Sequence, residues 1–216
     1  HVTTIDCYSS LEEYMKKVIH TLNAAVVALT VTFVPPSSEA RSSMERWFSD
    51  TDLDLIRSGD VKTTPFVANT SYAVCFTPGQ DCEGLIVNEI KQAQKSILLQ
   101  AYSFTSAPIA KALKEAKQRG IDIRVILDKS QRTEKYTGAS FLKHAGIPVV
   151  IDEQPAIAHS KIFVFDQQSV LTGSFNFTKS AQQRNAENLI IIKGDANLVR
   201  AYTENWNIRW KVSVNY

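Results

Sequence analysis

The sequence predicts an α/β fold, with a mixed, largely parallel sheet flanked by helices on both faces. Two observations lead to this prediction. From about residue 72 onward, strand-like apolar runs alternate with amphipathic helix-like segments, which is typical of parallel sheets covered on both sides. The chain of 216 residues, with 44% hydrophobic and 21% charged side chains, also has the size and composition of one soluble domain with a sizeable core.

Ordinary start and stop signals bound the predicted elements. Pro108 stands where a helix can begin, and Gly120 and Gly146 each end a helix-like run. Short apolar runs without helical periodicity mark the strands. The expected strands cover residues 72–76, 96–102, 121–127, 147–151, 161–165, 169–173 and 188–192, and the expected helices cover residues 83–95, 109–119, 136–145 and 196–210.

The first 40 residues have the pattern of a leader with a secretory signal. Met15 is the expected start, a basic pair follows it, an apolar run occupies 18–34, and small residues precede a cut after Ala40. Residues 1–14 then count as upstream sequence. A membrane anchor and an ordinary folded element are the alternatives, although the run is short for a span. The signal predicts a periplasmic or secreted protein without stable membrane association after cleavage.

Residues 41–71 are expected to form an extension or linker, and residues 72–216 form the predicted domain. The net charge of +2 permits a polyanionic partner without requiring one. Cys75 and Cys82 flank a turn-rich loop, so they would form a disulfide in an oxidising compartment, with two free or buried thiols as the alternative. No metal site is expected, because no second Cys/His pair lies at zinc-ligand spacing.

The residues that point most directly to chemistry lie between His159 and Asn176. His159 and Lys161 are two apart at the head of a strand, so their side chains share a face. Asp166 follows in a polar turn, and Ser174 and Asn176 again share a face after the returning strand. Together they supply a nucleophile or proton carrier, a fixed cation and two neutral donors, which can bind a phosphodiester and attack it. The alternative is a strand pair that ends in an exposed His and Lys.

This pattern resembles the His-x-Lys…Asp (HKD) signature of the phospholipase D superfamily, and above all its small periplasmic endonucleases from bacteria. The resemblance extends from about Tyr72 to Trp210 and includes Ala-Tyr-Ser-Phe-Thr at 101–105, Gly-Ser-Phe-Asn-Phe-Thr-Lys at 173–179 and Asn-Ala-Glu-Asn at 185–188. It implies an α-β-α sandwich with its site at one edge of the sheet. It also implies phosphodiester hydrolysis without a metal or cofactor, through a phosphohistidine.

The resemblance implies a role for each residue of the signature. His159 would be the nucleophile, and Lys161, Ser174 and Asn176 would bind the non-bridging phosphate oxygens. Because the chain holds one His-x-Lys pair, a homodimer would share one site, and His159 of the second chain would act as the general acid.

Two carboxylates complete the site that the resemblance implies. Glu187 matches a glutamate that accepts a hydrogen bond from the histidine ring and fixes its tautomer, with a surface carboxylate as the alternative. Asp166 is grouped with the catalytic residues because it matches the signature. Its position in a turn nevertheless favours structural support over chemistry.

Several basic residues follow predicted strands and could contact a nucleic-acid backbone. Solvated surface charge is the alternative for each of them. These weaker candidates are Lys129, Arg132, Lys135, Lys179 and Arg184. The sequence therefore predicts a metal-independent, non-specific endonuclease that acts on DNA or RNA. A lipid phosphodiesterase of the phospholipase D type and a nucleic-acid-binding module are the alternatives.

Overall fold

The computed structural model describes residues 61, 63–133 and 138–216. The leader predicted for residues 1–40, most of the linker predicted for 41–71, and Lys135 therefore lie outside the described residues. The domain predicted to begin at residue 72 has its first strand at Ser71–Thr77.

Within the described residues, eight strands form one sheet in the order β1-β7-β6-β5-β2-β3-β4-β8. The strands are β1 (Ser71–Thr77), β2 (Ser96–Ala101), β3 (Asp122–Asp128), β4 (Val149–Asp152), β5 (Lys161–Phe165), β6 (Ser169–Gly173), β7 (Glu187–Lys193) and β8 (Val214–Asn215). Seven of them lie within two residues of their predicted positions, and β8 was not predicted.

The predicted mixed sheet is confirmed, but the expectation that it is largely parallel is wrong. Only β2–β3 and β3–β4 pair in parallel, whereas the other five neighbouring pairs in the described sheet are antiparallel. A helix crossover joins β1 to β2, and both strands run in the same direction. However, β5, β6 and β7 insert between them, and each of these pairs antiparallel to its neighbours. Alternating strands and helices do not reveal such an insertion.

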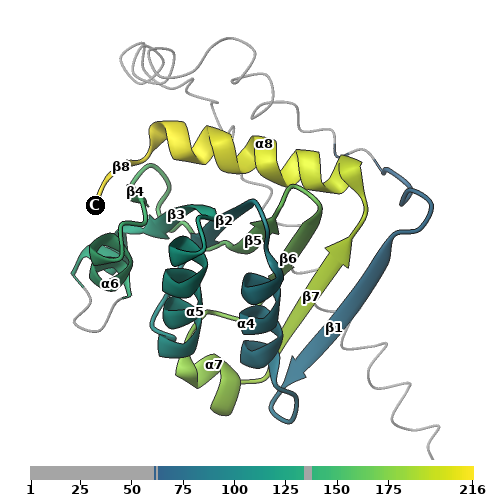
Figure 1. Cartoon of the computed structure of the whole chain (residues 1–216), viewed down its shortest axis with the longest axis horizontal. Coiled ribbons are helices and arrows are strands. Elements are labelled where there is room, and N and C mark those ends of the chain that lie inside the picture. The colour runs from purple at the N-terminus through teal and green to yellow at the C-terminus, as the bar shows by residue number, and fades with distance from the viewer. Residues whose placement is uncertain (1–60, 62, 134–137) are drawn as a thin grey trace, which may run out of the picture. The chain divides into compact units, whose positions relative to one another are not determined.

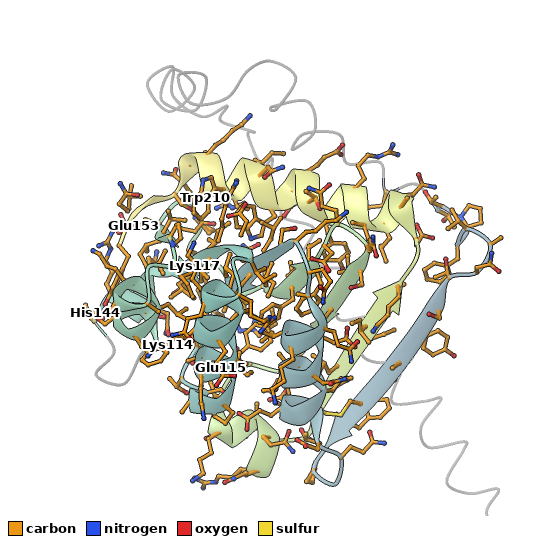
Figure 2. All side chains as sticks on the ribbon, in the orientation of Figure 1. Lys114, Glu115, Lys117, His144, Glu153 and Trp210 are labelled. Atoms are coloured by element: carbon orange, nitrogen blue, oxygen red, sulfur yellow. A yellow bond between two sulfur atoms is a disulfide. The ribbon has the colours of Figure 1, made fainter. Side chains whose placement is uncertain are left out.

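Helices cover both faces of the sheet, as predicted (Figure 1). They are α4 (Cys82–Gln92), α5 (Ala107–Gln118), α6 (Ala139–His144), α7 (Lys179–Gln183) and α8 (Ala196–Val212), with a 3-10 turn η1 (Lys129–Arg132). The larger core cluster lies between the sheet and α4, α5 and α6. The smaller one lies under α8, where buried Trp206 stacks on Trp210. Figure 2 labels Trp210.

Local signals account for the ends of the main helices. Ser106 caps α5 by accepting a hydrogen bond from the Ile109 N–H, and Pro108 stands in its first turn as expected. Asp195 caps α8 in the same way through the Leu198 N–H. Among the described residues, no helix combines the length and apolar character needed to cross a bilayer.

A disulfide joins Cys75 and Cys82, whose Cα atoms lie 5.6 Å apart. It connects β1 to the first residue of α4 across the turn-rich loop. The sequence left open either a disulfide or two free or buried thiols, and the structure contains the disulfide. The bond anchors the edge strand β1 to the helical layer at the end of the sheet where β1 finishes.

Candidate active site

The predicted residues meet at one end of the sheet because neighbouring strands are antiparallel. β5 and β7 begin at the end where β2 and β6 finish. His159 and Lys161 therefore lie beside Tyr102, which directly follows β2. Ser174 follows β6, and Glu187 begins β7 on the adjacent strand. Five side chains at or next to the ends of four strands thus form one candidate site.

Lys161 is buried, with 5% of its surface exposed. Its Nζ donates to the His159 carbonyl at 2.6 Å and lies 5.0 Å from the centroid of the Tyr102 ring. Burial lowers the pKa of Lys161, whereas the charge of the Glu187 carboxylate acts to raise it. An ammonium group shielded from water attracts an anion more strongly than an exposed one. The lysine is therefore suited to bind a phosphate oxygen.

His159 presents its ring to solvent beside this cation. Its side chain is exposed, and its ring centroid lies 4.6 Å from that of Tyr102 with the planes tilted by 48°. Tyr102 contacts both signature side chains, yet the sequence argument gave it no role. The signal was present, because Tyr102 lies in the matching segment 101–105 directly after a buried strand.

Ser174 and Glu187 form a compact hydrogen-bond network. Ser174 Oγ donates to Glu187 Oε2 at 2.5 Å, and Asn185 Nδ2 donates to Glu187 Oε1 at 2.8 Å. The backbone N–H and side-chain amide of Asn188 both donate to Ser174 Oγ. The hydrogen bond expected between Glu187 and His159 does not occur in the described part of the chain. Glu187 instead orients Ser174 and acts on Lys161 through its charge.

Asn176, two residues after Ser174, has a buried side-chain oxygen, Oδ1, without a hydrogen-bond partner among the described residues. Leaving such a group unpaired costs about 1–3 kcal/mol, so an unpaired buried group invites a functional explanation. A bound water that donates to this oxygen would provide one, while the amide nitrogen is left to donate to a phosphate oxygen.

Gly173 allows β6 to approach β7 closely at this point. The backbone N–H groups of Ser174 and Phe175 both donate to the Asn188 carbonyl. A Cβ at position 173 would collide with that same oxygen. The glycine thus permits the sharp turn that leads from β6 to Ser174 and Asn176.

Comparison with known proteins places this geometry in a family. A family model described as "Cardiolipin synthase, PLD-like domain" matches residues 86–210, which include every signature residue discussed above. The chain belongs to the phospholipase D family. The resemblance predicted from the signature is therefore confirmed. Like other members of this family, the protein is an enzyme that hydrolyses phosphodiester bonds.

Individual relatives support this assignment. A phospholipase D from Rickettsia conorii is 43% identical over 140 residues, which cover 65% of this chain and 70% of the relative. The crystal structure of Nuc from Salmonella typhimurium, a phospholipase D family member, has a TM-score of 0.66 at 35% identity and covers 68% of this chain and 98% of its own. Human mitochondrial cardiolipin hydrolase is 29% identical over 133 residues, which cover 62% of this chain and 52% of the relative.

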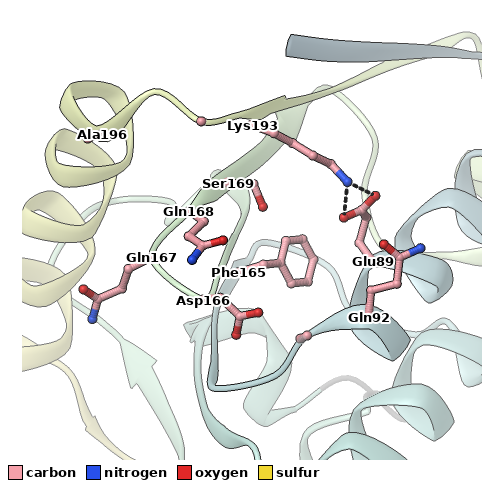
Figure 3. Close-up of a pocket in the computed structure, with 11 residues that line it drawn as sticks. Glu89, Gln92, Phe165, Asp166, Gln167, Gln168, Ser169, Lys193 and Ala196 are labelled. Atoms are coloured by element: carbon pink, nitrogen blue, oxygen red, sulfur yellow. Dashed lines mark hydrogen bonds and ion pairs between the residues drawn. The ribbon is translucent and has the colours of Figure 1, made fainter. Parts of the chain in front are cut away.

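The aspartate of the phospholipase D signature lies away from the other residues. Asp166 is at the opposite end of β5, a strand that spans about 16 Å. Its carboxylate accepts the backbone N–H groups of Gln94, Lys95 and Ser96 at 2.7–2.9 Å. Figure 3 shows it in a pocket beside the Glu89–Lys193 ion pair. Its grouping with the catalytic residues is therefore corrected, since Asp166 ties the β5–β6 turn to the start of β2.

Asp166→Asn is expected to destabilise the fold at neutral pH without changing kcat. Burial tends to raise the pKa of Asp166, but the three N–H donors bring it below its usual value. A depressed pKa contributes stability above the unfolded value of about 3.9, and this contribution is lost as pH falls through the lower folded value. Denaturant unfolding should show a loss of about 1–3 kcal/mol at pH 7 that shrinks below about pH 4. A variant with parent stability at pH 7 would contradict this role.

The weaker basic candidates differ in their surroundings. Lys129 Nζ donates to the Pro155 carbonyl, and Arg132 pairs with Glu153 at 2.8 Å, so internal contacts occupy both. Lys179 and Arg184 are exposed at the start of α7 and directly after it. Within the described ranges, no cluster of three His, Cys, Asp or Glu side chains could hold a metal ion. Metal-independent catalysis stays a prediction.

Proposed function

We propose that this protein is a metal-independent, non-specific endonuclease that hydrolyses DNA or RNA through a phosphohistidine at His159. The observation that carries the proposal is an exposed histidine beside a buried ammonium group at an open end of the sheet. A polymer backbone can reach such an end directly. Exposed Lys179 and Arg184 flank α7, which follows the signature at the same end, and can contact neighbouring phosphates (Figure 1).

The proposed reaction has two displacements. In the first, a neutral imidazole nitrogen of His159 attacks phosphorus, the P–N bond forms, and the P–O bond to the leaving alcohol breaks as an acid protonates that oxygen. In the second, water attacks phosphorus and gives its proton to the base left by that acid, the P–N bond breaks, and the neutral histidine is regenerated. Lys161 stabilises the non-bridging oxygens in both steps, with the Asn176 amide as a further donor. Ser174 joins them once its single hydroxyl hydrogen turns from Glu187 to the phosphate.

The general acid is proposed to be His159 of a second identical chain. The sequence contains one His-x-Lys pair, so a two-fold axis beside the site is the direct way to place two such histidines on opposite sides of one phosphorus. Of the other histidines, His144 lies at the end of α6 with its Nδ1 2.6 Å from the Ser140 carbonyl oxygen (Figure 2). His1 and His20 lie outside the described residues.

A row of exposed apolar side chains that reaches the site at one end supports this dimer. Tyr72, Val74 and Phe76 alternate along β1, are 71%, 39% and 56% exposed, and therefore share one side of this edge strand. Phe76 pairs across the sheet with Asn188, which bonds to Ser174. Such a contiguous apolar strip is typical of a protein interface.

Replacing Tyr72 and Phe76 together with serine is expected to weaken dimerisation by at least about tenfold, because each buried aromatic contributes about 1.5–3 kcal/mol. Activity should then fall at concentrations where the variant is monomeric by light scattering. Phe141→Ser, at a 44% exposed aromatic on α6, is the control and should stay dimeric. A parent protein that is monomeric and fully active would refute the shared site and would make His144 the first candidate acid.

One assay separates the substrate classes. Purified protein is incubated in excess chelator with plasmid DNA, with RNA, and with vesicles of phosphatidylcholine or cardiolipin. We expect nicking of the nucleic acid at the rate seen without chelator, because Lys161 supplies the charge that a metal would otherwise provide. Complete loss of activity in chelator, restored by one divalent metal, would contradict the mechanism.

Lipid phosphodiesterase is the second candidate function. The names of the Rickettsia and human relatives point to lipid substrates for those proteins. A groove between α5 and α6 is lined by apolar groups of Ala107, Ala110 and Phe141 and by polar side chains of α5. One of these is Lys114, which Figure 2 labels. Release of a headgroup from vesicles without any cleavage of nucleic acid would favour this function.

A periplasmic or secreted location is also proposed. The Cys75–Cys82 disulfide supports it, because such bonds persist in oxidising compartments and are rare in the cytosol. N-terminal sequencing of the mature protein tests the location, with a start at Arg41 expected after cleavage of the leader. An intact leader on cytoplasmic protein would contradict it.

A further inference from the structure

The backbone of His159 lies in a segment without regular structure. Residues 153–160 between β4 and β5 form neither helix nor strand. The orientation of the histidine therefore depends on individual contacts rather than on a ladder of hydrogen bonds. Three such contacts act on consecutive residues around it, one each at Ala158, His159 and Ser160.

Two of these contacts come from residues already placed in the site. Lys161 Nζ donates to the His159 carbonyl, and the Tyr102 backbone N–H donates to the Ser160 carbonyl at 3.1 Å. Both contacts hold carbonyl groups at or after His159, at the C-terminal end of the segment. The third contact holds the side that precedes His159, where the Ala158 N–H donates to Asp128 Oδ2 at 2.7 Å.

Asp128 is well placed to act as a rigid anchor. It is the last residue of β3, is 3% exposed, and lies between strands β2 and β4 of the sheet. Its second oxygen, Oδ1, accepts the Ser130 N–H at 2.9 Å. Burial acts to raise the pKa of Asp128, but the bonds from Ser130 and Ala158 and the charge of Lys129 bring it below its usual value. The group is therefore a carboxylate at neutral pH.

We propose that Asp128 is a positioning residue, whose carboxylate fixes the Ala158 N–H and thereby sets the direction in which the His159 ring meets phosphorus. The inference rests on the proposed role of His159 as the nucleophile. A nucleophile must lie about 3–3.5 Å from its target along the line of attack, and a displacement of about 1 Å can lower the rate 100-fold. An anchor one residue before the histidine controls such a displacement directly.

Asp128→Asn tests the proposal because the amide has nearly the same shape but only one acceptor oxygen. The asparagine side chain therefore cannot accept the Ser130 and Ala158 N–H groups on two separate oxygens, so one of these hydrogen bonds is lost. We expect kcat to fall about 10- to 100-fold with KM nearly unchanged, for both plasmid DNA and bis(p-nitrophenyl) phosphate. Asp122→Asn is the matched control, since this exposed residue begins the same strand and its carboxylate pairs, among the described residues, with Arg124 alone. It should keep the parent kcat.

The outcomes separate the two claims. A parent that cleaves neither substrate refutes the proposed function, whereas an active parent with a folded Asp128→Asn variant of unchanged kcat overturns the role of Asp128 alone. Hydrogen exchange on the parent protein provides a test that does not depend on how the variant folds. The Ala158 amide should exchange as slowly as the buried amides of β3. Exchange at the rate of an unprotected loop amide would show that the anchor is not formed and would also overturn the proposal.

Discussion

Replacing His159 with alanine should lower kcat for plasmid nicking by about four orders of magnitude or more, as expected when a nucleophile is removed. Folding should be unaffected, because the side chain is exposed and its ring contacts Tyr102 at the surface. Substrate affinity should be largely retained through Lys161. The measurement is single-turnover cleavage, with circular dichroism and DNA binding measured on the same preparation.

His144→Ala is the matched control for this variant. His144 is also exposed, lies at the end of α6, and should be replaceable with little change in rate (Figure 2). If His159→Ala stays within about tenfold of the parent, the barrier has risen by only about 1.4 kcal/mol, and His159 is not the nucleophile. A large loss in His144→Ala would instead place the general acid within the chain.

Replacing Lys161 with methionine is expected to lower kcat/KM about 1000-fold, the second-largest effect. Methionine fills much of the same buried volume but removes the ammonium group that we propose binds the phosphate oxygens. Stability should change little, because the cost of burying a charge disappears together with its interactions. Lys91→Met, on the exposed side of α4, is the control and should behave like the parent.

The same lysine gives the reaction a pH dependence. Burial lowers the pKa of Lys161, so its positive charge is lost at a pH below the ordinary value of about 10.4. At pH values where His159 is already fully neutral, the rate should therefore decline as pH rises further into the alkaline range. This decline should be missing from Lys161→Met. An identical alkaline profile in both proteins would show that another group causes it.

Much of the site could be predicted because it depends on local patterns. The short spacing in sequence brings His159 and Lys161 to the same end of β5, although His159 itself precedes the strand. The turn at Asp166 was predicted as a turn. The sheet order could not be predicted in the same way, because β1 finds its partner β7 across more than 100 residues of sequence. Long-range pairing is decided by packing of the whole core rather than by any one segment.

The contacts between strands were equally hidden in the sequence. Tyr102 reaches His159 only because β2 pairs with β5, and Asp128 reaches Ala158 only because β3 ends beside the loop that precedes β5. The hydrogen bond between Ser174 and Glu187 likewise depends on the pairing of β6 with β7. Short elements such as α7, η1 and β8 were missed because a few residues carry too weak a periodic signal.

The stereochemistry of the reaction at phosphorus tests the central claim of a phosphohistidine at His159 most directly. Each in-line displacement inverts the configuration, so two displacements restore it. A phosphorothioate diester of known configuration is hydrolysed in isotopically labelled water, and the configuration of the product is determined. The proposed mechanism predicts net retention of configuration. Net inversion would show that water attacks phosphorus directly, and His159 could then act only as a general base.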